Sequence, residues 1–247
     1  MKYWLLAFGI LISSAIQAQF GFYTQGGGNV TKLHVTRNPG GVVEGNFGYG
    51  WQASVGAEYH TQFGFFAFVE AGVSQQEFGK DSAGTTSVRA VVSQYTYHPL
   101  FLNFPLGFGY EFPLSKQLAL RVYAGAATQT GIGGTIHRTS TTYGKDTSGN
   151  QIIIHSDDTK RPINYGRSLQ ESNEFRSDLA NSVWCLNAGV GLNFSEHFEV
   201  TAIFQGVLTN ILPGFTSVAE IDKLQVVNVN LKYYFIRKYY NKPRPER

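Results

Sequence analysis

The amino-acid sequence predicts an all-β fold, an eight-stranded antiparallel transmembrane β-barrel with short periplasmic turns and longer extracellular loops. Three observations support this prediction: an export signal, repeated alternation of apolar and polar residues, and a regular exchange of short and long connections. The composition agrees, because aromatic residues make up 15% of the chain and 28 residues are glycine. Charged residues account for only 15%, against about a quarter in soluble domains.

Residues 1–18 have the features of a secretory signal peptide. Lys2 precedes an apolar stretch over residues 4–12, and small and polar residues follow as far as Ala18. Cleavage after Ala18 would leave Gln19 as the first mature residue. The alternative is a membrane anchor, but the apolar stretch has about half of the roughly 20 residues that a spanning helix needs. We therefore expect an exported chain.

The alternation recurs in seven segments and, more weakly, in a Gly-rich segment near residues 20–35. In chain order the seven are 47–60, 63–76, 100–112, 117–129, 183–194, 197–210 and 225–235. Successive side chains of a strand point to opposite faces, so each segment has one apolar, aromatic face and one polar face. The polar faces hold Gly, Asn, Gln, Ser and Thr with isolated charges. This pattern is typical of a narrow polar interior inside an apolar, lipid-facing exterior.

The connections between these segments alternate in length. Tight turns are expected at residues 60–63, 112–116 and 195–197, and long connections at 36–46, 79–87, 132–181 and 212–223. Aromatic residues gather at both ends of the segments, as the interfacial girdles of membrane barrels do. Short turns on the periplasmic side and long loops outside fit this pattern, and an even strand number leaves both chain ends in the periplasm.

The sequence also resembles the outer-membrane β-barrel domain family of Gram-negative bacteria that includes PorT-like proteins. The resemblance covers the mature N-terminus through Phe235 and is carried by "FAFVEAGVSQQEFGK", "LFLNFPLGFGYEF" and the closing "VNLKYYF". Residues 67–69 depart from it, because the family usually has a proline before the position of Glu70. The resemblance implies an outer-membrane barrel over residues 19–235, in a family whose members mostly have no assigned activity. PorT itself takes part in type IX protein secretion, so an accessory role there is an alternative function.

Six charged residues fall on the inward faces of the predicted strands. They are Glu58, Glu70, Glu111, Arg121, Glu199 and Lys232. A charge inside a narrow barrel must be paired or hydrated, so we expect a network in which Arg121 and Lys232 meet some of the four carboxylates. Such a network would close the lumen. The alternative is a narrow path that attracts cations.

One cluster of residues is suited to catalysis or metal binding. His155, Ser156, Asp157 and Asp158 lie in the long connection, close to His137 across an expected hairpin. They could supply a base and a nucleophile or metal ligands, but Ser and Asp are also ordinary turn residues. No second element supplies a partner at fixed spacing, so we assign no catalytic, cofactor-binding or metal-binding residue. A barrel hydrolase using this loop is a further alternative function.

Residues 236–247 form a basic tail that we expect in the periplasm. Its cations are Arg237, Lys238, Lys242, Arg244 and Arg247. Pro243 and Pro245 exclude a further strand or helix, and the five cations favour an acidic periplasmic partner, such as secretion machinery. The alternative is a solvated chain end.

The sequence therefore predicts a small, closed, monomeric barrel in the outer membrane of a Gram-negative bacterium. Its partners are expected to be membrane lipid and a periplasmic protein, not nucleic acid. We expect a role in binding or assembly, with no catalysis and no cofactor.

Overall fold

The computed structural model of the chain describes residues 19–37, 41–85, 89–115, 117–145, 150–166, 179–209, 211 and 221–237. Its strands are β1 (Gln19–Arg37), β2 (Gly41–His60), β3 (Phe65–Gln75), β4 (Phe78–Thr85), β5 (Ala90–Pro113), β6 (Ala119–Lys145), β7 (Gln151–Pro162), β8 (Tyr165–Gly166), β9 (Leu179–Ala180), β10 (Ser182–Asn193), β11 (Phe198–Val207) and β12 (Ile221–Arg237). Among these residues there is no helix that is long and apolar enough to cross a membrane.

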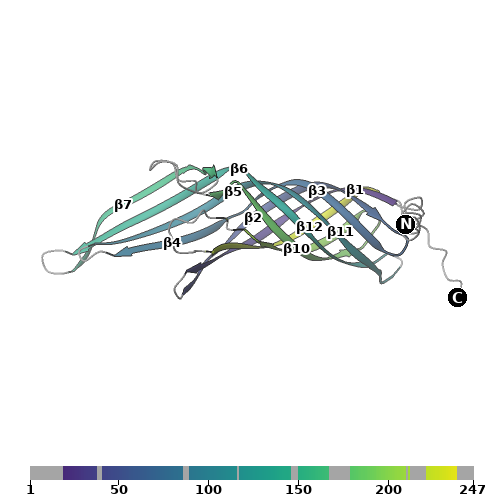
Figure 1. The fold of residues 1–247 in the computed structure, drawn as a ribbon, viewed down its shortest axis with the longest axis horizontal. Helices are drawn as coiled ribbons and strands as arrows, with labels where there is room; N and C mark the ends of the chain where they lie inside the picture. Colours follow the sequence, from purple (N-terminus) through teal and green to yellow (C-terminus); the bar gives the residue numbers. More distant parts are fainter. Residues whose placement is uncertain are drawn as a thin grey trace, which may run out of the picture.

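Eight strands form a closed antiparallel ring, which confirms the predicted fold (Figure 1). Around the ring the order is β5, β3, β2, β1, β12, β11, β10 and β6, and β6 pairs with β5 to close it. The first and last strands are neighbours, paired from Gly21 opposite Arg237 to Thr36 opposite Ile221. A closed ring satisfies the backbone hydrogen bonds of every strand, as a hydrocarbon environment requires.

The outer surface of the ring is apolar and the inner surface is mainly polar, as the alternation predicts. In β12, Val227, Val229 and Leu231 are about half exposed, whereas Asn228 and Asn230 are buried. At the short-turn end, aromatic rings on the outside contact one another in pairs. Phe65 and Tyr110 lie 4.9 Å apart between ring centroids, and Phe198 and Tyr233 lie 5.2 Å apart. These contacts form part of one interfacial girdle.

Glycines on the inner surface make room for the large inward side chains. A Cβ atom at Gly56 would lie 2.4 Å from Cζ of Tyr23, and one at Gly109 would lie 2.4 Å from Cζ of Phe66. Both distances are shorter than any real contact, so the aromatic rings occupy the space that a larger residue would need. The narrow barrel therefore depends on a glycine beside each of these inward aromatic side chains.

Three of the connections expected as long loops are largely strands, which corrects the prediction for residues 36–46, 79–87 and 132–181. β5 and β6 continue beyond the ring and remain paired from Gly134 opposite Pro99 to Tyr143 opposite Ala90. β4 pairs with this part of β5, and β7 pairs with this part of β6. A four-stranded sheet thus extends from the ring at the end opposite to the chain termini (Figure 1); we call it the outer sheet.

The outer sheet begins where the pairing of β5 with β6 shifts its register, between Leu100 and Phe101. Gly134 lies at this point with a φ of 126°, a conformation that favours glycine. A bulge of this kind bends the strands and increases their twist, so β5 and β6 leave the circular path of the ring.

Candidate functional site

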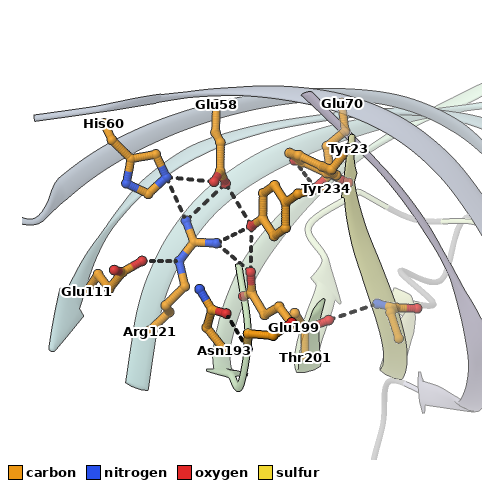
Figure 2. Close-up of polar contacts among 12 residues, drawn as sticks. Tyr23, Glu58, His60, Glu70, Glu111, Arg121, Asn193, Glu199, Thr201 and Tyr234 are labelled. Carbon is orange, nitrogen blue, oxygen red and sulfur yellow. Dashed lines mark hydrogen bonds and ion pairs between the residues drawn. The ribbon is translucent and has the colours of Figure 1, made fainter. Parts of the chain in front are cut away.

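The interior of the ring contains a buried cluster of charges next to the short turns. Arg121 of β6 lies at its centre (Figure 2). Its Nη2 is 3.0 Å from Oε2 of Glu58 and its Nε is 3.5 Å from Oε2 of Glu111. Nη1 contacts Glu199 and the hydroxyl of Tyr234. We call these five residues the charge cluster.

Burial of the charge cluster is nearly complete. The side chains of Arg121, Glu58 and Glu199 are 1%, 0% and 0% exposed. The hydroxyl of Tyr234 lies between the two carboxylates, 3.1 Å from Glu58 Oε2 and 2.6 Å from Glu199 Oε2. The guanidinium carbon of Arg121 also lies 3.8 Å from the centroid of the Phe66 ring. The charged groups, the tyrosine hydroxyl and the Phe66 ring therefore contact one another inside the barrel at this level.

A second polar group lies beside the charge cluster, around Glu70 of β3. The hydroxyl of Tyr23 donates to Glu70 Oε1 at 2.6 Å, and Gln25 Nε2 donates to Oε2 at 2.7 Å. Lys232 lies beside this group and forms no ion pair within 4.0 Å among the described residues, and its Nζ lies 4.0 Å from the centroid of the Tyr23 ring. This is a cation–π contact. All six predicted inward charges therefore lie inside the ring, and Arg121 rather than Lys232 joins the carboxylates.

A small cavity of about 50 Å³, with both polar and apolar residues in its lining, lies in the middle of the barrel. Its lining includes Gln25, Asn103, Asn187 and Lys232. The side-chain oxygens of the three amides are buried without a hydrogen-bond partner in the protein. A cavity of this size holds only a few water molecules, and such waters would satisfy these oxygens.

The outer end of the ring is filled by apolar side chains, a feature that the predicted polar interior did not include. Five of them, all 0% exposed, come from different parts of the chain: Leu33, Phe78, Phe101, Leu179 and Leu224. They pack with Val183, Val207, Ile136 and Ile163 in one cluster, which we call the apolar core. The inward residues thus change from charged to amide to apolar between the short-turn end and the outer end.

The short strands β8 and β9 cover the apolar core. The backbone nitrogen of Ile163 donates to the carbonyl of Gly134 at 3.1 Å, and the hydroxyl of Tyr165 donates to the carbonyl of Gly133 at 2.7 Å. The ring of Tyr165 lies over Gly131, where a Cβ would come within 2.0 Å of it. These contacts hold the segment against β6, so buried side chains occupy the interior of the barrel at both ends, the charge cluster at one end and the apolar core at the other.

The residues considered for catalysis lie on β7, at the edge of the outer sheet. His137 on β6 contacts Asp158 on β7, so the expected hairpin does bring them together. His155 and Ser156 are adjacent in a strand and therefore point to opposite faces, and both are exposed. Within the described ranges, no three His, Cys, Asp or Glu side chains are grouped as metal ligands would be. The structure therefore does not bring the imidazole of His155 together with the hydroxyl of Ser156 as a catalytic pair.

The predicted contact residues of the basic tail lie almost entirely outside the described residues. Arg237 ends β12, whereas Lys238, Lys242, Arg244 and Arg247 are not described. The proposed signal peptide, residues 1–18, is likewise outside the described part. Both remain predictions.

Comparison with known proteins places the chain in a family. The family model described as "Outer membrane protein beta-barrel domain" matches residues 4–235. The chain therefore belongs to the outer membrane protein β-barrel domain family, and its ring of strands crosses the outer membrane. The comparison with curated proteins gives no match.

Three solved structures illustrate the low identity between this chain and the structures that it resembles. The attachment invasion locus protein Ail of Yersinia pestis is 9% identical, with 87% of this chain and 99% of that chain covered and a TM-score of 0.34. Neisserial surface protein A is 10% identical, with 87% and 97% covered and a TM-score of 0.33. The N-terminal barrel domain of OprF from Pseudomonas aeruginosa is 13% identical, with 86% and 98% covered and a TM-score of 0.27.

Proposed function

We propose that this protein is a closed outer-membrane anchor that presents the outer sheet at the cell surface for binding. The observation that supports the proposal is that buried side chains occupy the lumen twice, in the charge cluster at the short-turn end and in the apolar core at the outer end. A barrel filled in this way offers no passage for solutes, so its function resides on its surface.

The outer sheet is the surface best suited to that function. Strands of about 9–11 residues are enough to cross a membrane, yet β5 has 24 residues and β6 has 27. The additional length supports β4 and β7 outside the ring. Along β7 nearly every side chain is exposed, including Ile152, Ile153 and Ile154. Exposed apolar residues on a structured extension are typical of interaction sites.

Planar-bilayer recording of the purified protein tests whether the lumen is closed. The wild type should show no steady conductance. Arg121→Ala should also remain closed, because the apolar core blocks the same path in series. A steady ion current through the wild type would contradict the proposal and favour the cation path instead. A current through Arg121→Ala alone would show that the apolar core does not seal the barrel.

A further inference from the structure

We propose that the outer edge of β7 pairs antiparallel with β7 of a second copy of this chain, held in a facing membrane. The outer sheets of two barrels would then join into one continuous sheet between two surfaces. This inference rests on the proposed function, because it names the partner that the outer sheet binds.

The first observation is that β7 is an edge strand. In the order of the ten-stranded sheet it is the last member, paired with β6 alone. Eleven of its twelve residues are exposed and Asp157 is partly exposed, so nothing in the described part of the chain covers its outer side. An edge strand of this length presents a row of backbone donors and acceptors to any strand that can approach it.

The second observation is a charge pattern in β7 that is complementary to itself. Residues 157–161 read Asp-Asp-Thr-Lys-Arg. In an antiparallel pair centred on Thr159, Asp158 lies opposite Lys160, and Asp157 lies opposite Arg161. Two-fold symmetry repeats both pairs, so each face of the joined sheet carries two pairs of opposite charges.

Other registers are less favourable. Residues that lie opposite each other in two paired strands are on the same face of the sheet. In a two-fold symmetric antiparallel pair, the symmetry axis must therefore pass beside one residue of each strand and not between two residues. A pair centred on Asp157 or Asp158 would place two identical carboxylates directly opposite each other, which is destabilising. Charges on an edge usually keep other strands away. Here the same charges exclude most strands and favour a second copy in one register.

The orientation of β7 determines where the second copy must lie. β7 runs along the long axis of the molecule, at the end opposite to the chain termini (Figure 1). Antiparallel pairing reverses this direction, so the two barrels point toward each other from opposite sides. Two copies in one membrane have the same orientation and cannot form this pair.

The lengths of the strands allow such a contact. The pairing of β6 with β10 ends at Thr130, and Thr159 lies opposite Arg138. The eight residues from Thr130 to Arg138 reach at most about 27 Å at about 3.4 Å per residue. From Thr159 to the start of β7 at Gln151 is also eight residues. The described end of β7 would therefore lie level with the rim of the partner barrel.

Clustering of lipid vesicles that carry the purified protein tests the proposal. Wild-type vesicles should cluster, and the clustering should fall at high salt. In the Asp158→Lys variant, positions 158 and 160 are both basic, and in the Lys160→Asp variant they are both acidic. Like charges would then lie opposite each other, so vesicles that carry either variant alone should remain dispersed. A mixture of the two populations should cluster again, because every pair between them is then opposite in charge. Glu196→Lys, a change at the short-turn end, should leave clustering unaffected.

A disulfide between the two copies would locate the axis of the pair. Two vesicle populations can carry the Thr159→Cys variant with two different protein tags. On oxidation they should form a disulfide-linked dimer that contains both tags, because residue 159 of one chain lies opposite residue 159 of the other at a distance that a disulfide spans. Ile153→Cys should give much less. The native Cys185 is buried and does not interfere.

Three results would overturn the proposal: wild-type vesicles that stay dispersed, clustering that survives either single charge change, or a mixture that fails to recover. Recovery in the mixture cannot come from misfolded variants. None of these outcomes bears on the closed lumen, so conductance and clustering can fail independently.

Discussion

Arg121 is the residue on which the inner closure depends most. Replacing it with Ala would leave Glu58 and Glu199 buried without their cation, and breaking a buried pair in this way costs about 3–5 kcal/mol. We expect the free energy of unfolding, measured by urea titration in lipid vesicles, to fall by that amount. Arg138→Ala is the control, because within the described part of the chain the contact of Arg138 is with the ring of Tyr95 in the outer sheet, and such contacts contribute about 0.5–1 kcal/mol. Equal losses would contradict the charge cluster as described.

Two adjacent tyrosines in β12 allow a matched test of the same cluster. The hydroxyl of Tyr234 lies between Glu58 and Glu199, whereas Tyr233 points outward and is 37% exposed. Tyr234→Phe should lower the free energy of unfolding by about 1–3 kcal/mol, because buried acceptors lose a donor. Tyr233→Phe should change it by less than about 0.5 kcal/mol. A reversed order would mean that the inward and outward faces of β12 have been exchanged.

The sequence was sufficient to place these residues inside the barrel but not to pair them. Period-two alternation shows which residues point inward, and it placed Arg121 and the four Glu residues on inner faces. It carries no information on which strands are neighbours around the ring, so the contact of Lys232 with Tyr23 could not be foreseen. That contact requires β1 beside β12, the pair that closes the ring.

At the scale of single strands, β10 tests which residues face lipid. Val190 is 49% exposed and lies between the outward aromatic residues Trp184 and Phe194, where Val190→Lys should lower the free energy of unfolding by about 2–4 kcal/mol. Ser182→Lys, at the outer end of the same strand, should cost about 0–1 kcal/mol, because charges near the interface are tolerated. Similar costs at both positions would show that the ring does not sit in the membrane as the family and the exposed apolar surface indicate.

The hairpin of β6 and β7 should be separable from the ring. Arg138 and Thr159 are opposite each other, so residues 139–158 can be replaced by Asn-Gly, a pair suited to a two-residue turn. We expect the shortened chain to insert and to keep its heat-modifiable gel migration, because the pairing of β6 with β10 and the apolar core remain. Failure to fold would show that the outer sheet contributes to the stability of the ring itself.

Apart from the hairpin expected between His137 and Asp158, the outer sheet was missed from sequence for a physical reason. Alternation marks a strand only where its two faces lie in different environments, as lipid and lumen are for the ring. Both faces of β7 are exposed, so "QIIIHSDDTKRP" has no such alternation. The β-branched Thr, Ile and Val of β5, β6 and β7 were the available signal for strands. The apolar core was missed because the prediction assumed that all inward positions are polar. Leu33 and Phe101 are apolar residues at inward positions and did not fit that assumption.

At the scale of the whole molecule, the protein divides into a membrane ring, which we propose is sealed, and an outer sheet at the end opposite to the start of β1 and the end of β12 (Figure 1). Charge, amide and apolar layers fill the ring in that order. The ring supplies insertion and the sheet supplies the surface, so the account requires the outer sheet to lie outside the cell.

Cysteine labelling of intact cells tests that requirement most directly, because the chain has a single cysteine, Cys185, and it is buried. Ile153→Cys on β7 should react with a membrane-impermeant maleimide on intact cells, since Ile153 is 64% exposed. Gln62→Cys, in the turn between β2 and β3, should react only after the outer membrane is permeabilised. Labelling of Gln62→Cys on intact cells, with Ile153→Cys protected, would contradict the account.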